Sequence, residues 1–213
     1  MADYKKPDYW SLKAQKEGYP ARSVYKLKEM DERFGLLKPA GRGAGASGGA
    51  VFRVLDLGAA PGSWSLYLLR KIGPRAGFLC AADLSPLSRQ YDRGLFDGDN
   101  FFFIQGDITA SGVREKIGGR GPYNLVASDA APATTGNRSV DTARSLELAE
   151  TALVYAENVL AKGGSLVIKI FQGGDTAEIL KRLKDLFETA KSFKPEACRN
   201  ESFETYYLGL GKK

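Results

Sequence analysis

The sequence predicts an α/β fold: a mostly parallel seven-stranded sheet with an antiparallel terminal hairpin and helices on both faces. From residue 50 onward, short β-rich runs alternate with helical segments, which is the pattern of βαβ units. The last two runs are joined by a connection too short for a crossover helix, so we expect them to pair antiparallel. With 213 residues, 43% of them hydrophobic, the chain suits one domain with a single core.

The chain divides into three parts within one expected domain, residues 1–213. Residues 1–34 form a basic extension that is predicted to be helical over residues 11–34. Residues 35–49 are rich in glycine and alanine and predict a flexible surface loop. Residues 50–213 then supply the sheet and its covering helices.

Seven runs in the core have the composition of strands, and two segments between them carry apolar residues at helical spacing. The strands are expected at residues 52–57, 77–83, 101–105, 123–128, 165–171, 192–197 and 205–210. The helices are expected at residues 141–160 and 176–190, and a further helix is expected to begin near Ser63.

Composition narrows the function. The chain has 31 Lys and Arg against 25 Asp and Glu, a formal net charge of +6, which favours a polyphosphate partner. It has no histidine, and its only cysteines, Cys80 and Cys198, are far apart, so neither a metal site nor a disulfide framework is predicted. Without an apolar run of about 18 residues or a signal peptide, we expect a cytoplasmic protein with no membrane association.

The run VLDLGAAPGSWS, residues 54–65, is an apolar strand followed by a glycine-containing turn and a helix. Gly58 and Gly62 allow the backbone to turn tightly and to approach a ligand at the carboxyl end of the strand. Asp83, Asp107 and Asp129 stand at the ends of the next three strands in the chain. Each could be an ordinary turn former, but together they predict a nucleoside-binding edge.

A catalyst in this chain must work without histidine. Lys169 is the strongest candidate, because a lysine inside the apolar strand VIKIF is costly to bury unless it is paired. A lysine that is neutral or strongly hydrogen-bonded among other charges can serve in proton transfer.

The chain resembles the FtsJ (RrmJ) family of ribosomal RNA 2'-O-ribose methyltransferases over nearly its whole length. The resemblance lies in EGYPARSVYKL, LDLGAAPGSWS, SDAAPATTGNRSVDTARS and VIKIFQG. It implies a Rossmann-like class I methyltransferase fold with S-adenosyl-L-methionine as cofactor. Gly62 and Trp64 would lie in the cofactor-binding loop, with Asp83 near the ribose, Asp107 near the adenine and Asp129 near the methionine end.

The resemblance also implies a catalytic tetrad. Lys26, Asp129, Lys169 and Glu204 match the Lys-Asp-Lys-Glu set of RNA 2'-O-methyltransferases. Lys169 would be the base or the hydroxyl-orienting group, Asp129 its partner, and Lys26 and Glu204 would position the ribose. Glu204, rather than Glu201, is assigned to the tetrad because the spacing Ser202-x-Glu204-x-Tyr206 matches the family's terminal motif. Glu201 stands where the family would have a basic residue.

The basic extension interleaves cations with aromatic residues, a composition that suits RNA. The RNA-contact candidates are Lys5, Lys6, Arg22, Lys26 and Arg199. The family implies large-subunit (23S) ribosomal RNA as substrate, at an A-loop uridine within the 50S subunit, methylated by a protein expected to be a monomer.

Three alternative functions stay open, two of them enzymatic and one a binding function. A transfer RNA substrate is one. A nicotinamide-dependent oxidoreductase is disfavoured because the turn reads GAAPG rather than GxGxxG. A non-catalytic RNA-binding ribosome-assembly factor is disfavoured because all four tetrad positions are occupied.

Overall fold

The computed structural model describes residues 8–38, 51–173, 176–199 and 202–213. Its centre is a seven-stranded sheet with the strand order β3-β2-β1-β4-β5-β7-β6. Strands β1 to β5 are parallel to one another, and β7 pairs antiparallel with both β5 and β6. The predicted fold class is confirmed.

The strands are bounded as follows: β1 Phe52–Leu57, β2 Gly77–Asp83, β3 Phe101–Gln105, β4 Tyr123–Ser128, β5 Leu160–Phe171, β6 Phe187–Phe193 and β7 Glu204–Lys212. The helices are α1 Tyr9–Lys16, α2 Val24–Phe34, α4 Ser63–Ala76, α5 Ser111–Gly118, α6 Arg138–Val159 and α7 Ala177–Leu186, with a short 3-10 turn, η1, at Leu95–Asp97. The bounds of the first four strands agree with the sequence prediction.

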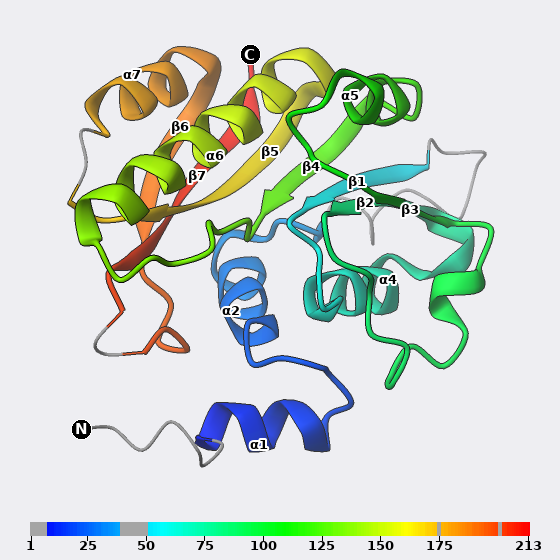
Figure 1. Ribbon diagram of the computed structural model, residues 1–213. Helices are drawn as coiled ribbons and strands as arrows, with labels where there is room; N and C mark the ends of the chain where they lie inside the picture. Colours follow the sequence, from blue (N-terminus) through cyan, green and yellow to red (C-terminus); the bar gives the residue numbers. More distant parts are fainter. Residues whose placement is uncertain (1–7, 39–50, 174–175, 200–201) are drawn as a thin grey trace.

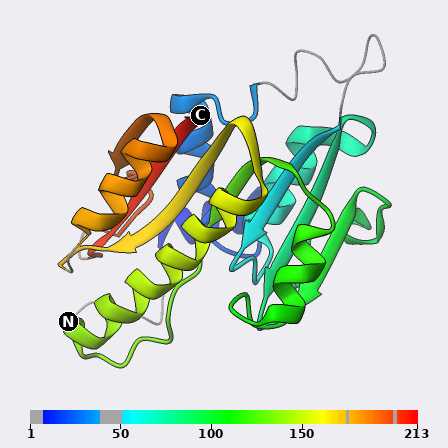
Figure 2. The same cartoon turned by 90° about the horizontal axis from the view of Figure 1, so that it is seen from above.

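Helices cover both faces of the sheet (Figure 1). On one face lie α4 and α2, with α1 beyond α2, and their apolar side chains meet Val54, Leu125 and Leu208. On the other face α5, α6 and α7 lie next to one another over Leu55 and Ile168 (Figure 2). Because both faces are covered, β1 and β4 are buried almost throughout.

The predicted single helix over residues 11–34 is wrong in one respect. The structure has two helices, α1 and α2, with a turn between them. Gly18 in this turn has φ 73°, a left-handed conformation that ends α1, and Pro20 follows it. The turn lets α2 lie against the sheet instead of continuing along α1.

The sixth strand begins earlier than predicted. Residues 192–197 were expected to form it, but β6 is Phe187–Phe193, and α7 ends at Leu186 rather than at residue 190. Phe187 is buried over Gly209 of β7, where a Cβ would lie 2.3 Å from the ring. This contact places Phe187 in the sheet, and the polar residues after it pass along the exposed edge.

Candidate active site

The predicted acids meet at one edge of the sheet. Asp83 ends β2, Asp107 follows β3 and Asp129 follows β4, and all three line a cavity of about 590 Å³ together with Gly58. Parallel strands bring their carboxyl ends to the same edge, which explains why residues so far apart in the chain converge. The cavity also receives side chains from α6, among them Arg144 and Glu147.

Gly58 sits where two loops pass closest to each other. Its φ is 73°, and a Cβ there would lie 2.5 Å from the Cα of Ala130, in the loop that follows β4. No other residue fits this backbone without moving the Ala130 segment. The glycine therefore keeps the turn after β1 against the turn after β4, at the wall of the cavity.

The acids also order the loops that carry them. Asp83 accepts hydrogen bonds from the backbone N–H of Ala60 at 2.9 Å and of Ser85 at 2.7 Å. Asp107 accepts from the backbone N–H and the hydroxyl of Thr109, and these bonds lower the pKa of Asp107 below its usual value. Both carboxylates are thus held in place at the cavity, and the lowered pKa keeps Asp107 ionised.

Gly62 and Trp64 occupy the start of α4, next to the cavity turn. Gly62 is the N-cap with φ 106°. The Trp64 ring is buried against Tyr206, with 6.0 Å between centroids, and its indole N–H donates to the carbonyl of Ser23 at 2.8 Å. The Trp64 side chain therefore joins α4 to the start of α2.

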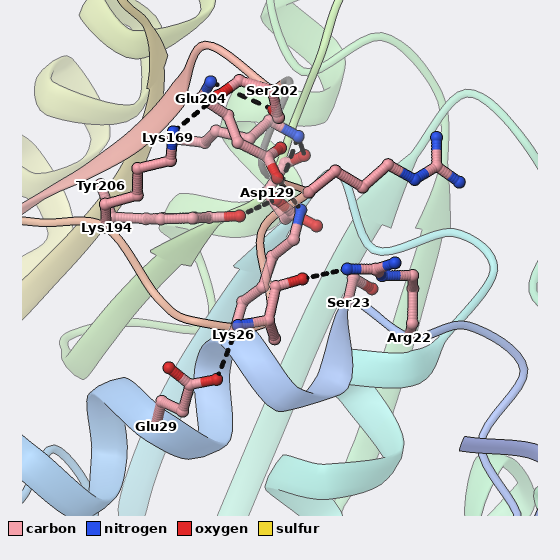
Figure 3. A network of polar contacts seen from close by, with 12 residues as sticks. Arg22, Ser23, Lys26, Glu29, Asp129, Lys169, Lys194, Ser202, Glu204 and Tyr206 are labelled. Atoms are coloured by element: carbon pink, nitrogen blue, oxygen red, sulfur yellow. Dashed lines mark hydrogen bonds and ion pairs between the residues drawn. The ribbon is translucent and has the colours of Figure 1, made fainter. Parts of the chain in front are cut away.

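The four tetrad residues converge, although they come from α2, the end of β4, β5 and β7 (Figure 3). Nζ of Lys169 lies 3.0 Å from Oδ1 of Asp129 and also donates to the Asp129 carbonyl. Nζ of Lys26 lies 2.6 Å from Oε1 of Glu204. Their side chains are between 6% and 15% exposed, so two ion pairs are largely withdrawn from water beside the cavity that Asp129 lines.

Sheet register explains part of this convergence. Lys169 of β5 lies directly opposite Tyr206 of β7, and Glu204 precedes Tyr206 by two residues. Opposite residues and residues two apart share one face of a sheet. That face is the one covered by α2, which supplies Lys26.

The charges within the tetrad affect one another. Burial alone would raise the pKa of Asp129, but Lys169, Lys26 and the hydrogen bond from Tyr206 outweigh it and hold that pKa below its usual value. Burial alone would lower the pKa of Lys26, but Asp129 and Glu204 outweigh it and raise that pKa. At neutral pH, Lys26 is a cation and Asp129 an anion.

Tyr206 belongs to this network, a role that the sequence reasoning missed. Its hydroxyl donates to Oδ1 of Asp129 at 2.7 Å, and its side chain is fully buried. Burial and the neighbouring carboxylates raise the pKa of Tyr206 well above its usual value, so the hydroxyl remains a donor. Its position two residues after Glu204 on the same strand was the signal that could have identified it.

Asp56 is a second buried acid that the sequence reasoning did not select. It lies inside β1, completely buried; Oδ2 accepts from the Ser65 hydroxyl at 2.6 Å, and among the described residues Oδ1 has no hydrogen-bond partner. Burial, assisted by the charges of Asp129 and Asp83, raises the pKa of Asp56 to about 7, against the opposing effect of the Ser65 bond.

We expect Asp56→Asn to gain stability relative to the native chain as pH rises from 5 to 8. Between about pH 4 and 7 the folded protein holds a proton on Asp56 that the unfolded chain has released, so native stability falls as pH rises. Each pH unit in this window costs the native chain up to about 1.4 kcal/mol, a cost that asparagine lacks. Melting temperatures of both proteins at pH 5, 6, 7 and 8 measure it; a difference that does not change with pH would contradict the prediction.

The predicted RNA-contact residues differ in their surroundings. The Arg22 guanidinium pairs with Asp8 and donates to the carbonyl of Ala197, and its side chain is 15% exposed. The Arg199 side chain is 58% exposed, with its Nε 4.0 Å from Asp8. Lys5 and Lys6 lie outside the described residues, as does Glu201.

None of the described helices is long and apolar enough to cross a membrane. In the part of the chain that the structure describes, no group of three or more His, Cys, Asp or Glu side chains is arranged to hold a metal ion.

A family model described as FtsJ-like methyltransferase matches residues 19–212. The chain is 53% identical to the ribosomal RNA large subunit methyltransferase E of Treponema denticola, over 99% of this chain and 97% of that protein. It is 44% identical to the protein of the same name from Borreliella afzelii, over 95% of this chain and 96% of that one.

A solved structure has the same fold. A ribosomal RNA methyltransferase from Plasmodium falciparum superposes with a TM-score of 0.72 at 24% identity, covering 91% of this chain and 98% of that one. At this level of identity the likeness concerns the fold, a Rossmann-like methyltransferase sheet.

Proposed function

Because the chain belongs to the FtsJ-like methyltransferase family, we propose that it transfers a methyl group from S-adenosyl-L-methionine to a ribose 2'-hydroxyl of large-subunit ribosomal RNA. The observation that carries this proposal is the convergence of Lys26, Asp129, Lys169 and Glu204 beside the cavity at the sheet edge. Two paired lysines and two carboxylates suit a reaction on a sugar hydroxyl, because they can hold its oxygen and manage its proton without histidine.

The residues around the cavity fit the cofactor. Asp83 and Asp107 present carboxylates, which can accept hydrogen bonds from ribose hydroxyls and from an adenine amino group. The anion of Asp129 faces the same cavity and suits the cationic methionine end. Gly62 would shape the turn, since its own N–H already donates to the carbonyl of Ala59 at 2.7 Å. Trp64 would contribute through its backbone N–H, because the first N–H groups of a helix have no acceptor within it.

S-adenosyl-L-methionine supplies a methyl group on a sulfonium, and its transfer to a hydroxyl oxygen leaves a thioether and releases the hydroxyl proton. Lys169 would orient the hydroxyl as an ammonium group or, once it has lost its own proton to solvent, accept the hydroxyl proton as an amine, with Asp129 holding it in place. Lys26 remains charged and would fix the ribose together with Glu204. Correct alignment of the oxygen can contribute several orders of magnitude to the rate.

RNA as the substrate is supported by charge and by the relatives. The net charge of +6 favours phosphate, and the two curated relatives are named for large-subunit ribosomal RNA. Arg199, with 58% of its side chain exposed, is better placed to meet a phosphate than Arg22, which is 15% exposed; both lie against Asp8. We propose an A-loop uridine of 23S RNA in the 50S subunit as the target, and the cytoplasm as the place of action.

The test is methyl transfer from labelled S-adenosyl-L-methionine to three RNAs: 50S subunits, protein-free 23S RNA and transfer RNA. We expect label on 50S subunits at one ribose, resistant to alkaline hydrolysis at the following phosphodiester. Label on transfer RNA alone would contradict the proposed substrate and identify transfer RNA as the substrate instead. Tight binding to 50S subunits without transfer would support a non-catalytic assembly factor and end the enzymatic proposal.

A further inference from the structure

The active site is assembled from two separate parts of the chain. Asp129, Lys169 and Glu204 belong to the sheet, whereas Lys26 comes from α2, which lies outside the sheet. On its inner side α2 packs through apolar side chains, including Leu27 and Met30. Apolar packing is non-directional, so by itself it sets the position of Lys26 only loosely.

Directional contacts join α2 to the connection between β6 and β7 (Figure 3). The two carboxylate oxygens of Glu29 accept hydrogen bonds from the backbone N–H groups of Glu196, at 2.7 Å, and Ala197, at 2.9 Å. Arg22, at the entry of α2, donates to the carbonyl of Ala197. Lys26 and Glu29 are three residues apart in α2, so that they face the same side of the helix, and Arg22 precedes the helix by two residues.

The same connection leads into Glu204. Glu204 is the first residue of β7, and its N–H donates to the hydroxyl of Ser202 at 3.2 Å. Nζ of Lys194 donates to the carbonyl of Ser202 at 2.7 Å and thereby ties the two ends of the connection together. Because Lys194 binds Ser202, a restraint on the connection at Glu196 and Ala197 also restricts the residues just before β7. Glu204, which forms its ion pair with Lys26, is the first residue of that strand.

A carboxylate is the side chain that this arrangement requires. Both of its oxygens accept and neither donates, so it can receive two neighbouring backbone N–H groups at once. Such charge-assisted bonds are stronger than bonds between neutral groups. Glutamine keeps one acceptor oxygen, but its amide group would place a donor against the second N–H.

We propose that Glu29 is a positioning residue for methyl transfer, which fastens α2 to the β6–β7 connection so that Lys26 and Glu204 meet at the ribose site. This inference rests on the proposed function. Glu29 has no role in the chemistry itself, and it acts through the Lys26–Glu204 pair, whose atoms are 2.6 Å apart. Displacement of a catalytic group by about 1 Å can cost about 100-fold in rate.

The first experiment compares Glu29→Ala and Glu29→Gln with a matched control, Glu32→Gln, which changes an exposed glutamate on the same helix. We expect kcat on 50S subunits to fall by about 10-fold or more in Glu29→Ala and by less in Glu29→Gln, which keeps one acceptor. Affinity for S-adenosyl-L-methionine should stay within about 2-fold in all three, because Glu29 lies outside the cavity. Native kcat in Glu29→Ala, or equal loss of kcat and cofactor affinity, would overturn the proposal.

A double-mutant cycle separates positioning from general stability. If Glu29 acts through the pair, Glu29→Ala should reduce kcat much less in a Glu204→Gln background than in the native chain. Full additivity of the two effects would contradict the proposed route. The cycle uses variants that retain cofactor binding, and Glu29→Gln takes the place of Glu29→Ala if the alanine variant does not fold.

A third measurement needs no substrate. Amide hydrogen exchange at Glu196 and Ala197 should be at least about 10-fold faster in Glu29→Ala than in the native protein, while exchange in β1 is unchanged. Unchanged exchange at these two amides would remove the restraint on which the inference depends. If the native protein transferred no methyl group but this exchange result held, the proposed function would fail and the link between α2 and the connection would stand.

Discussion

Replacement of Lys169 by alanine is expected to lower the rate of methyl transfer by at least about 100-fold, with cofactor affinity within about 2-fold of native. Lys169 is buried in β5, and its amine is fixed against the carboxylate and the carbonyl of Asp129, beside the cavity. A group that orients a hydroxyl and takes its proton contributes about 100-fold to 10,000-fold to a rate. Single-turnover transfer to 50S subunits and calorimetric cofactor titration measure the two quantities.

Two further variants sharpen this prediction. Lys191→Ala changes an exposed strand lysine in β6 and should retain the native rate. Lys169→Arg keeps the positive charge at every accessible pH, so it can orient a hydroxyl but cannot accept its proton. We expect the arginine variant to be as slow as the alanine variant; a substantially faster one would assign Lys169 to orientation alone. A near-native rate in Lys169→Ala would remove its assigned role.

The sequence alone predicts features that follow a repeated pattern, such as apolar strands. It also predicts residues whose burial is energetically costly, such as a lysine inside a strand. The bounds of β1, β2 and β4 follow from largely apolar runs ended by turn residues, because these strands are covered on both faces and tolerate few polar residues. The edge strand β3 is only partly buried, and its own apolar run FFFI marks its bounds. Lys169 stands out for the converse reason, as a cation in such a run. The acids at strand ends could be grouped because parallel strands share an edge.

Other features depend on contacts between distant segments. Residues 187–190 continue the helical pattern of α7 in the sequence. The packing of Phe187 against Gly209 of β7 places them in strand β6 instead. Trp64 looks like a cofactor residue within its motif, yet its indole binds the Ser23 carbonyl, 41 residues away in the chain. Glu29 has no distinguishing signal in the sequence, because its partners lie 167 and 168 residues further on.

Asp129→Asn is expected to have the largest combined effect, a loss of transfer of at least about 100-fold together with a loss of stability. Asp129 is the anion that both lysines share, and it also accepts from Tyr206. Asparagine leaves Lys26 and Lys169 with Glu204 as their only carboxylate partner in the tetrad, so one buried cation lacks a counterion. Removal of one partner from a buried ion pair costs about 3 to 5 kcal/mol.

The pH dependence of this loss gives a separate check on its cause. The pKa of Asp129 is lower in the folded protein than in the unfolded chain, so its stabilising effect is fully present above the unfolded value, near pH 4, and is lost as pH falls through the folded value. The charge of Asp129 also raises the pKa of Asp56, so the comparison is made in an Asp56→Asn background, which removes that coupled titration. In this background, proteins with and without Asp129→Asn should differ by a constant free energy of unfolding from pH 5 to 8 and converge below about pH 4. Urea unfolding across this range measures the difference, with the exposed Asp99→Asn as control. A gap that persists unchanged in acid would mean that asparagine disturbs packing rather than charge, because only the ionised carboxylate distinguishes the two proteins electrostatically.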